Sequence, residues 1–161
     1  MDINGVTGWR LPDVKPVNGS SFIYAISSNG GTDFSFNITS TQSELTHLYH
    51  VTLGNKSQYD ASGNYRTGFE SLGKNFGLFS NVQGSYYWSG VEYGPRTVNA
   101  WFFATYTGGQ YYTNKGDEIY AWAVHPGDVG RAIATPVPEP ETYALALTGL
   151  AAAFGLRRRG R

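Results

Sequence analysis

The sequence predicts an α+β body built on an antiparallel sheet, with one helix and long loops, followed by a hydrophobic helix at the C-terminus. Aromatic residues make up 16% of the 161 residues and 21 residues are glycine, a composition typical of strands joined by turns. Four short aromatic segments, separated by turn residues, lie between positions 85 and 125. The composition changes abruptly at Ala134, so the chain divides into a body and a tail.

The chain carries no net charge, because twelve Lys and Arg balance twelve Asp and Glu. A general nucleic-acid binder would show a basic excess, so we expect no nucleic-acid partner. Four basic residues stand in the last five positions, which leaves residues 1–135 with eight basic and ten acidic side chains. The lack of cysteine excludes disulfides, thiolate metal sites and thiol nucleophiles.

Residues 21–27 and 33–39 are predicted to form the first two strands. Large apolar residues stand at alternate positions in both segments, at 22, 24 and 26 and at 34, 36 and 38, as they do on one face of a strand. Asn29-Gly30-Gly31 supplies a turn between them, so we expect the two strands to pair as a hairpin.

Residues 41–53 are predicted to form the single helix of the body. Four apolar residues fall near one helical stripe: Leu45, Leu48, Tyr49 and Leu53. Ser43 or Thr41 is placed to cap the N-terminus of this helix, and Gly54 is placed to end it.

Residues 85–93, 98–106, 110–113 and 119–125 are predicted as four strands of an antiparallel meander, because turn residues separate them. The second of these strands is apolar on both alternating faces, for example at Trp101 and Phe102. This pattern predicts a central strand that is covered on each side.

Two groups of polar residues in the body are candidate metal sites. His47 and His50 lie three residues apart on the predicted helix with Glu44 nearby, but His125 is the only other histidine. We therefore expect partly exposed helix histidines and no metal site or cofactor. Residues 58–64 contain oxygen side chains at alternate positions, but the spacing departs from a calcium loop and favours a plain turn.

Trp9-Arg10-Leu11-Pro12 is the first marked cluster of the body. Leu11 is extended because a proline follows it, and Trp9 is too large to leave exposed. Arg10 carries five donors, so we expect it to pin neighbouring loops; ligand binding by Arg10 is the alternative.

The tail has a stiff part and an apolar part. Prolines recur through residues 132–141, which predicts an extended linker. Residues 143–156 carry no charge, and a helix over them spans about 21 Å, short of the roughly 30 Å hydrocarbon core. The predicted membrane segment within residues 142–161 is represented by Tyr143, Leu145, Leu147, Leu150, Phe154 and Leu156. The basic cluster that follows is expected to stay on the cytoplasmic side: Arg157, Arg158 and Arg159. The alternative is a buried amphipathic helix with a basic end.

The tail contains, in this order, Pro138-Glu139-Pro140, an Ala/Leu/Gly segment and a terminal Arg cluster. In these parts and in their order it closely resembles the PEP-CTERM sorting signal of Gram-negative bacteria. The resemblance implies that an exosortase, a membrane enzyme, removes the tail during transfer to the cell surface or matrix. Such proteins also need an export signal, yet Met1–Ser20 contains no apolar stretch of the required length. We therefore expect that the chain starts inside a longer gene product.

The body resembles the Lcl C-terminal-like domain of bacteria, a domain without an established activity, over about residues 5–130. The resemblance rests on these motif residues: Trp9, Arg10, Leu11, Pro12, the Glu44-Leu45 start of the helix, Tyr87, Trp88, Ser89, Ala100, Trp101, Phe102, Tyr120, Ala121, Trp122, Ala123 and Val124. It implies a fold like that of C-type lectins and formylglycine-generating enzymes, with a twisted antiparallel sheet, and a domain over residues 1–131. A long insertion at residues 15–41 departs from the family, as does His125 where an Arg is usual.

The sequence therefore predicts an exported surface or matrix protein that is not an enzyme and that binds polysaccharide or partner proteins. No calcium signature of the lectins is present, and formylglycine-type oxidation would need cysteines. Glu92 and His125, with a serine, are the one acid–base pair considered for a hydrolase. A purely structural matrix component is the remaining alternative.

Overall fold

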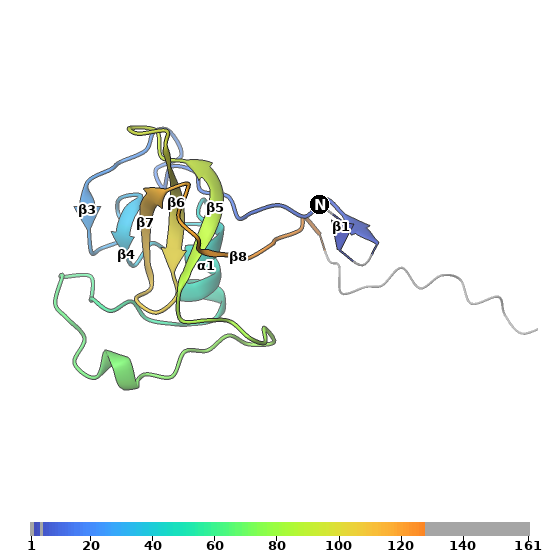
Figure 1. Cartoon of the computed structure of the whole chain (residues 1–161). Coiled ribbons are helices and arrows are strands. Elements are labelled where there is room, and N and C mark those ends of the chain that lie inside the picture. Colours follow the sequence, from blue (N-terminus) through green and yellow to red (C-terminus); the bar gives the residue numbers. More distant parts are fainter. Residues whose placement is uncertain (1, 4, 128–161) are drawn as a thin grey trace, which may run out of the picture. The chain divides into compact units, whose positions relative to one another are not determined.

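The computed structural model describes residues 2–3 and 5–127, and its main element is a six-stranded mixed sheet (Figure 1). The strands of the sheet are β3 (Ile26–Ser27), β4 (Phe34–Phe36), β5 (Tyr86–Glu92), β6 (Asn99–Ala104), β7 (Gly109–Asn114) and β8 (Tyr120–Ala121). Their order across the sheet is β3-β4-β7-β6-β5-β8. A separate antiparallel pair is formed by β1 (Asp2–Ile3) and β2 (Val6–Thr7).

The antiparallel centre of the sheet, β5-β6-β7, confirms the first three strands of the predicted meander. Every residue of β6 is buried, as expected for a central strand. Gly108 closes the turn between β6 and β7 with φ +71, and a Cβ there would lie 3.0 Å from Ser57 Cα. Only glycine combines that backbone conformation with such a close approach.

The prediction for the fourth strand was wrong in its partner and its length. β8 covers only Tyr120–Ala121 and pairs parallel with β5 instead of continuing the meander beside β7. The free edge of β7 is already occupied by β4, so the chain crosses back to the other edge of the sheet. Beyond β8, Val124 forms an isolated bridge with Arg10.

The predicted hairpin was also wrong, because β3 and β4 run parallel, with Ile26 opposite Phe34. A buried aspartate explains the return of the chain. The Asp33 carboxylate accepts the backbone N–H groups of Val17 and Ile23, each at 2.7 Å. These bonds hold Asp33 beside Val17 and Ile23, which precede β3. The chain therefore returns to the start of β3 before β4 begins, and the two strands run in the same direction.

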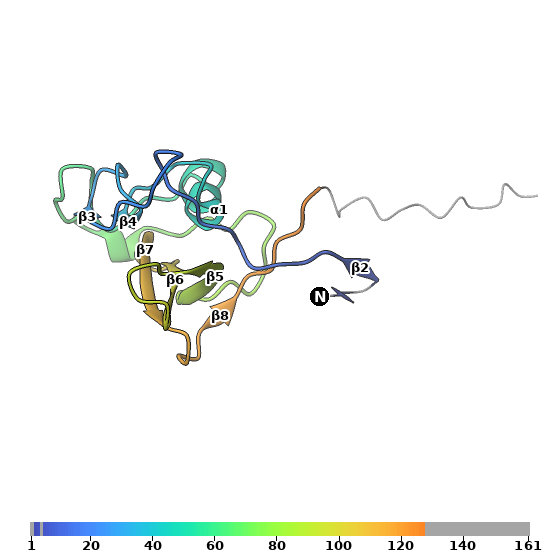
Figure 2. The same cartoon turned by 90° about the horizontal axis from the view of Figure 1, so that it is seen from above.

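The helical segment begins later than predicted, as α1 (Glu44–His47), and continues as one π-helical turn, η1 (Leu48–Thr52). Ser43 occupies the N-cap position, but its hydroxyl donates to Gln110 Oε1 at 2.5 Å and caps nothing. The segment ends before Gly54, as predicted. It lies on one side of the sheet (Figure 2), while a short 3₁₀ turn, η2 (Phe69–Ser71), lies in the long loop before β5.

The core lies between the sheet and the segments on its helix side. One buried cluster joins the helix to the sheet and contains Leu45, Tyr49, Tyr87 and Phe103. A second cluster contains Val14, Tyr93 and Trp101, and the half-buried rings of Phe22, Tyr24 and Phe34 pack against it. The predicted insertion 15–41 therefore contributes three aromatic rings to the core, those of Phe22, Tyr24 and Phe34.

The body is thus mostly β, with one short helix. Within residues 2–3 and 5–127, no helix is both long and apolar enough to cross a membrane. The predicted helix over 142–161 lies outside the described residues.

Candidate binding face on the sheet

Strand register divides the side chains of the sheet between two faces. Phe102 lies opposite Trp88 on β5 and opposite Tyr111 on β7, so these three residues share a face. Phe103 and Tyr87 point the other way, into the cluster formed with the helix. We call the face opposite the helix the outer face; it carries Phe36, Tyr86, Trp88, Ala100, Phe102, Ala104, Tyr111 and Thr113.

Aromatic rings form a continuous network on the outer face. The ring centroids of Tyr86 and Phe102 lie 4.7 Å apart, and those of Phe102 and Tyr111 lie 5.8 Å apart. Beyond Tyr86 the network reaches Tyr106 at 5.4 Å, and beyond Tyr111 it reaches Phe36 at 5.9 Å. Seven connected rings are called the aromatic track: Tyr65, Tyr59, Phe36, Tyr111, Phe102, Tyr86 and Tyr106. Phe34 also contacts Tyr111, but it packs against the buried cluster around Trp101 and is not counted in the track.

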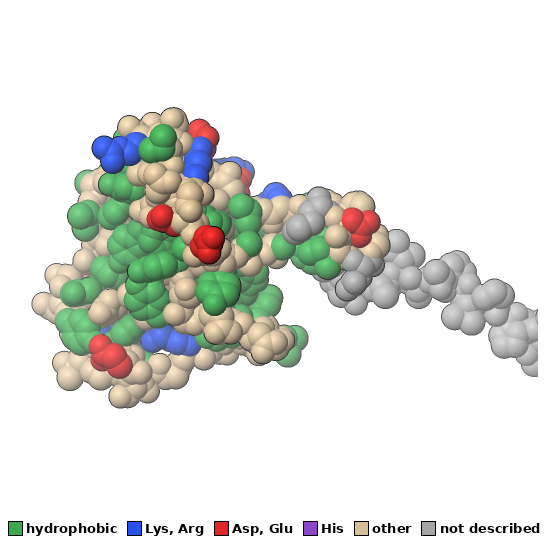
Figure 3. Space-filling view, in the orientation of Figure 1, with side chains coloured by type: hydrophobic (Ala, Val, Ile, Leu, Met, Phe, Trp, Pro, Cys, Tyr) green, Lys and Arg blue, Asp and Glu red, His purple; other side chains and the backbone are tan. Residues whose placement is uncertain are grey.

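No helix of the described residues covers the aromatic track. Figures 1 and 2 place the helical segment behind the sheet, and Figure 3 shows hydrophobic side chains gathered over its front. Tyr86 and Tyr106 are 37% and 42% exposed. Phe102 is only 8% exposed because neighbouring rings shield it. The residues of β6 are buried on both faces, as predicted, and on the outer face side chains of adjacent strands cover them among the described residues.

A hollow opens at each end of this face. The Lys74 hollow, of about 670 Å³, lies between the turn after β6 and the long loop before β5, and Tyr106, Thr107, Gln58, Glu70 and Lys74 line it. The Lys115 hollow, of about 340 Å³, is lined by Trp88, Gly90, Glu92, Ala100 and Lys115. Both volumes are within the range of small-ligand sites.

Each hollow contains one lysine and one glutamate. Lys115, which follows β7, forms an ion pair with Glu92 at the end of β5. In the other hollow, the Lys74 ammonium lies 3.5 Å from the centroid of the Phe69 ring, a cation–π contact. Burial lowers the pKa of Lys74, while a hydrogen bond from Tyr65 lowers the pKa of Glu70. Each hollow is therefore polar but formally neutral.

Two tyrosine hydroxyls meet at the edge of the aromatic track. The Tyr106 hydroxyl donates to the Tyr86 hydroxyl at 2.5 Å. Burial, and next this hydrogen bond, raise the pKa of Tyr106 to about 12. The pair fixes two exposed rings beside the Lys74 hollow, which leaves them fewer rotamers to lose when a ligand binds.

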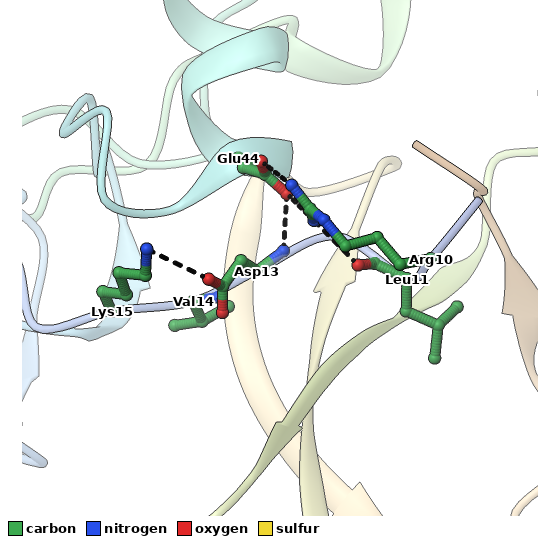
Figure 4. Close-up of polar contacts among 6 residues, drawn as sticks. All are labelled: Arg10, Leu11, Asp13, Val14, Lys15 and Glu44. Carbon is green, nitrogen blue, oxygen red and sulfur yellow. Dashed lines mark hydrogen bonds and ion pairs between the residues drawn. The ribbon is translucent and has the colours of Figure 1, made fainter. Parts of the chain in front are cut away.

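The predicted fold motif around Arg10 forms a structural clamp (Figure 4). The Arg10 guanidinium binds both carboxylate oxygens of Glu44 at 2.6 and 2.7 Å, and Glu44 also accepts the Asp13 N–H at 2.6 Å. The hydrogen bond from Arg10 lowers the pKa of Glu44. Arg10 thus pins the N-terminal segment to the helix, the contact expected from the structural interpretation of this residue.

The other motif residues divide between core and face. Trp101 is fully buried, Pro12 is buried, and Ser89 donates to the Trp101 carbonyl at 2.9 Å. Tyr87 and Trp122 lie 5.5 Å apart in the helix-side core. Trp9 packs edge-on against His125 at 5.3 Å. Leu11, Trp88 and Ser89 line the Lys115 hollow, so these motif residues lie at the candidate site.

The histidines and the polar turn have structural partners. His47 Nδ1 lies 2.8 Å from the Thr39 carbonyl, and the two ring nitrogens of His50 each lie 3.0 Å from a backbone carbonyl oxygen. Burial lowers the pKa of His50. Asp60 accepts the N–H groups of Ser62 and Asn64, which closes a turn as expected. Among the described residues, no group of three or more potential ligands is placed to hold a metal.

Glu92 and His125 do not come together as an acid–base pair. Glu92 binds Lys115, and His125 Nε2 lies 2.8 Å from the Thr7 carbonyl oxygen. The sequence interpretation missed most of the aromatic track, because Tyr86, Tyr106 and Tyr111 have the same residue type as the core tyrosines. The available signal was strand alternation. Tyr86 directly precedes Tyr87, and successive residues of a strand point to opposite faces, so the two tyrosines could not both lie in the core.

Comparison with known proteins identifies the tail. Residues 136–159 match the model of the PEP-CTERM protein-sorting motif. This match confirms the predicted motif and implies a cell-surface protein that an exosortase sorts through a C-terminal membrane-associated signal. No curated protein and no solved structure matches the chain, and the Lcl-like domain is not identified. The sorting residues, Pro138, Glu139 and Pro140, lie outside the described residues.

Proposed function

We propose that the body binds extracellular polysaccharide through its outer face, as a non-enzymatic protein of the cell surface or matrix. The observation that carries this proposal is the aromatic track, a connected set of rings that includes the exposed Tyr86 and Tyr106, on a sheet face that no helix of the described chain covers. Exposed apolar patches of this kind mark interaction sites in soluble domains.

A sugar chain fits this surface by its chemistry. Pyranose rings present C–H groups on their faces, which pack on aromatic rings, and hydroxyls at their edges, which need hydrogen-bonding partners. The outer face supplies both, because Tyr86 and Tyr106 combine a ring with a hydroxyl. Gln58, Thr107 and Lys74 add polar groups at one end.

The sorting motif supports an extracellular ligand. It directs the chain outward through exosortase, the processing partner, so the ligands that the body meets are surface and matrix polymers. Membrane attachment through residues 142–161 would be transient, since the exosortase removes the tail.

We further propose that the body is an Lcl-like, C-type-lectin-like domain. The role of Arg10 supports this, since the motif residue links the N-terminal segment to Glu44 at the start of the helix, where the family pattern also places a glutamate. The mixed sheet and the parallel β3–β4 pair are features that this family assignment has to accommodate.

The experiment is retention of the full-length chain on a panel of immobilised polysaccharides: dextran, a β-glucan, a galactomannan and a polyuronate. We expect retention on at least one polymer, and loss of that retention in the double variant Tyr86→Ser/Tyr106→Ser. Tyr120→Ser is the matched control, because Tyr120 is 51% exposed but lies outside the aromatic track. Absence of retention on every polymer would contradict polysaccharide binding and favour a purely structural role.

A further inference from the structure

The two hollows are connected by the rings of the outer face. Trp88 lines the Lys115 hollow and lies directly opposite Phe102 on the neighbouring strand. The Phe102 ring contacts Tyr86, and Tyr86 contacts Tyr106, which lines the Lys74 hollow. Four aromatic side chains therefore lie in succession between the hollows: Trp88, the buried Phe102, Tyr86 and Tyr106.

The distance between the hollows exceeds the size of a single sugar. Ala100 lines the Lys115 hollow, and Tyr106 at the far end of the same segment lines the other. The four strand steps from Ala100 to Ala104 alone cover roughly 13 Å. A ligand that occupies both hollows is therefore a chain of several linked units.

The charges along this path cancel. The Lys115 hollow contains the Glu92–Lys115 ion pair, and the Lys74 hollow contains Lys74 and Glu70. The strand residues of the outer face between them carry no charged side chain: Tyr86, Trp88, Ala100, Phe102, Ala104, Tyr111 and Thr113. The body as a whole has two more acidic than basic residues over positions 1–135. No positive field is therefore present to concentrate a polyanion at this face.

We infer that the Lys74 hollow, the aromatic track and the Lys115 hollow form one extended site, and that its ligand is an uncharged polysaccharide chain. This inference rests on the proposed polysaccharide binding and specifies its substrate class. Tyr106 holds the chain at one end and Trp88 at the other. The glutamate and lysine of each hollow bond to hydroxyls of the terminal sugar units.

The test measures binding of the full-length chain to β-glucan oligosaccharides of increasing length, to dextran and to a polyuronate. We expect affinity for one neutral series to rise with length until both hollows are occupied, and to change less than about twofold between 50 and 500 mM salt. Trp88→Ala and Tyr106→Ala should each weaken binding of the longest oligosaccharide about tenfold. Trp88→Phe should restore most of the affinity, and Tyr120→Ala should leave it unchanged.

Three results would overturn the inference. Tighter binding of the polyuronate that weakens steeply with salt would contradict a neutral ligand, although polysaccharide binding itself would stand. Affinity that stays constant from the disaccharide upward would contradict an extended site. Binding of no polymer at all would overturn both the inference and the function on which it rests.

Discussion

The hydroxyls of Tyr86 and Tyr106 lie 2.5 Å apart and join the start of β5 to the turn that follows β6. Both rings belong to the aromatic track and both are more than one-third exposed. Their hydrogen bond fixes the orientation of two ligand-accessible rings without burying them. The outer face is thus ordered in advance of binding, which limits the entropy that a ligand must overcome.

The raised pKa of Tyr106 predicts a specific alkaline titration. With its pKa raised to about 12, Tyr106 stays protonated in the folded chain at a pH where an unfolded tyrosine is ionised. Its contribution to stability is therefore present below pH 10 and is lost as the pH rises toward 12. Tyr86→Phe removes the accepting oxygen, so the pKa of Tyr106 should fall toward 10. Ultraviolet titration of tyrosinate measures this shift.

The control for this titration is Tyr120→Phe, because Tyr120 is 51% exposed and its ring contact is with Tyr87 instead of Tyr106. That variant should leave the late-titrating group in place. If Tyr86→Phe leaves the ionisation near pH 12 unchanged, the two hydroxyls are not coupled in solution.

Breaking the Arg10–Glu44 clamp should cost about 1 kcal/mol of unfolding free energy, since the pair is two-pronged but partly exposed. Glu44→Gln is the variant. The pKa of Glu44 is lowered in the fold, so the clamp stabilises above pH 4.5 and its contribution is lost as the pH falls below that value. Denaturant unfolding at pH 7 and pH 3 measures this.

We therefore expect Glu44→Gln and the native chain to differ at pH 7 and to converge at pH 3. Glu118→Gln serves as the matched control, because Glu118 is exposed. A difference between native chain and Glu44→Gln that is as large at pH 3 as at pH 7 would show that charge plays no part in the clamp.

Gln110 is predicted to be the most costly polar side chain of the sheet to remove. It is 1% exposed, accepts the Ser43 hydroxyl at 2.5 Å and donates to the Asp33 carbonyl at 2.8 Å. Gln110→Ala leaves two buried groups unpaired and should lower the unfolding free energy by about 2–3 kcal/mol. Gln83→Ala, whose amide bonds locally at the surface, should cost less than about 0.5 kcal/mol. Equal losses would refute the buried bridge.

Sorting through the tail makes a separate prediction. In a host with an exosortase, replacement of Pro138, Glu139 and Pro140 by alanine should leave the tail attached, because these residues belong to the matched motif that implies exosortase processing. Intact mass of the recovered chain measures whether Arg161 is retained. Thr135→Ala is the control outside the matched residues. Equal tail removal in both variants would contradict recognition of the motif.

The sequence predicted the centre of the fold because local signals determine it. The turns around β6 and its two apolar faces indicated a central strand, and the stripe through Leu45 and Tyr49 indicated the helix. The predicted pairing of the outer strands was wrong, because long-range hydrogen bonds determine which strands pair. The carboxylate of Asp33 redirects the chain before β4, and nothing in residues 28–33 signals that bond.

The candidate site was predicted less well than the fold. Arg10 was assigned its structural role because a guanidinium beside a tryptophan favours clamping. The aromatic track escaped prediction because a tyrosine on the outer face and one in the core differ only by strand parity. Tyr86 and Tyr87 are adjacent in sequence, yet one is exposed and the other is buried. The register between β5 and β6 decides which of the two tyrosines lies on the outer face, because it places Tyr87 opposite the core residue Phe103.

Footprinting of tyrosine and tryptophan oxidation by hydroxyl radicals, with and without the polysaccharide that the full-length chain retains best, tests the central claim most directly. Binding through the outer face predicts protection of Tyr86, Trp88 and Tyr106, with no change at Tyr112 and Tyr120. Protection of Tyr112 or Tyr120 with none at the aromatic track would place the ligand elsewhere and contradict the proposed binding face.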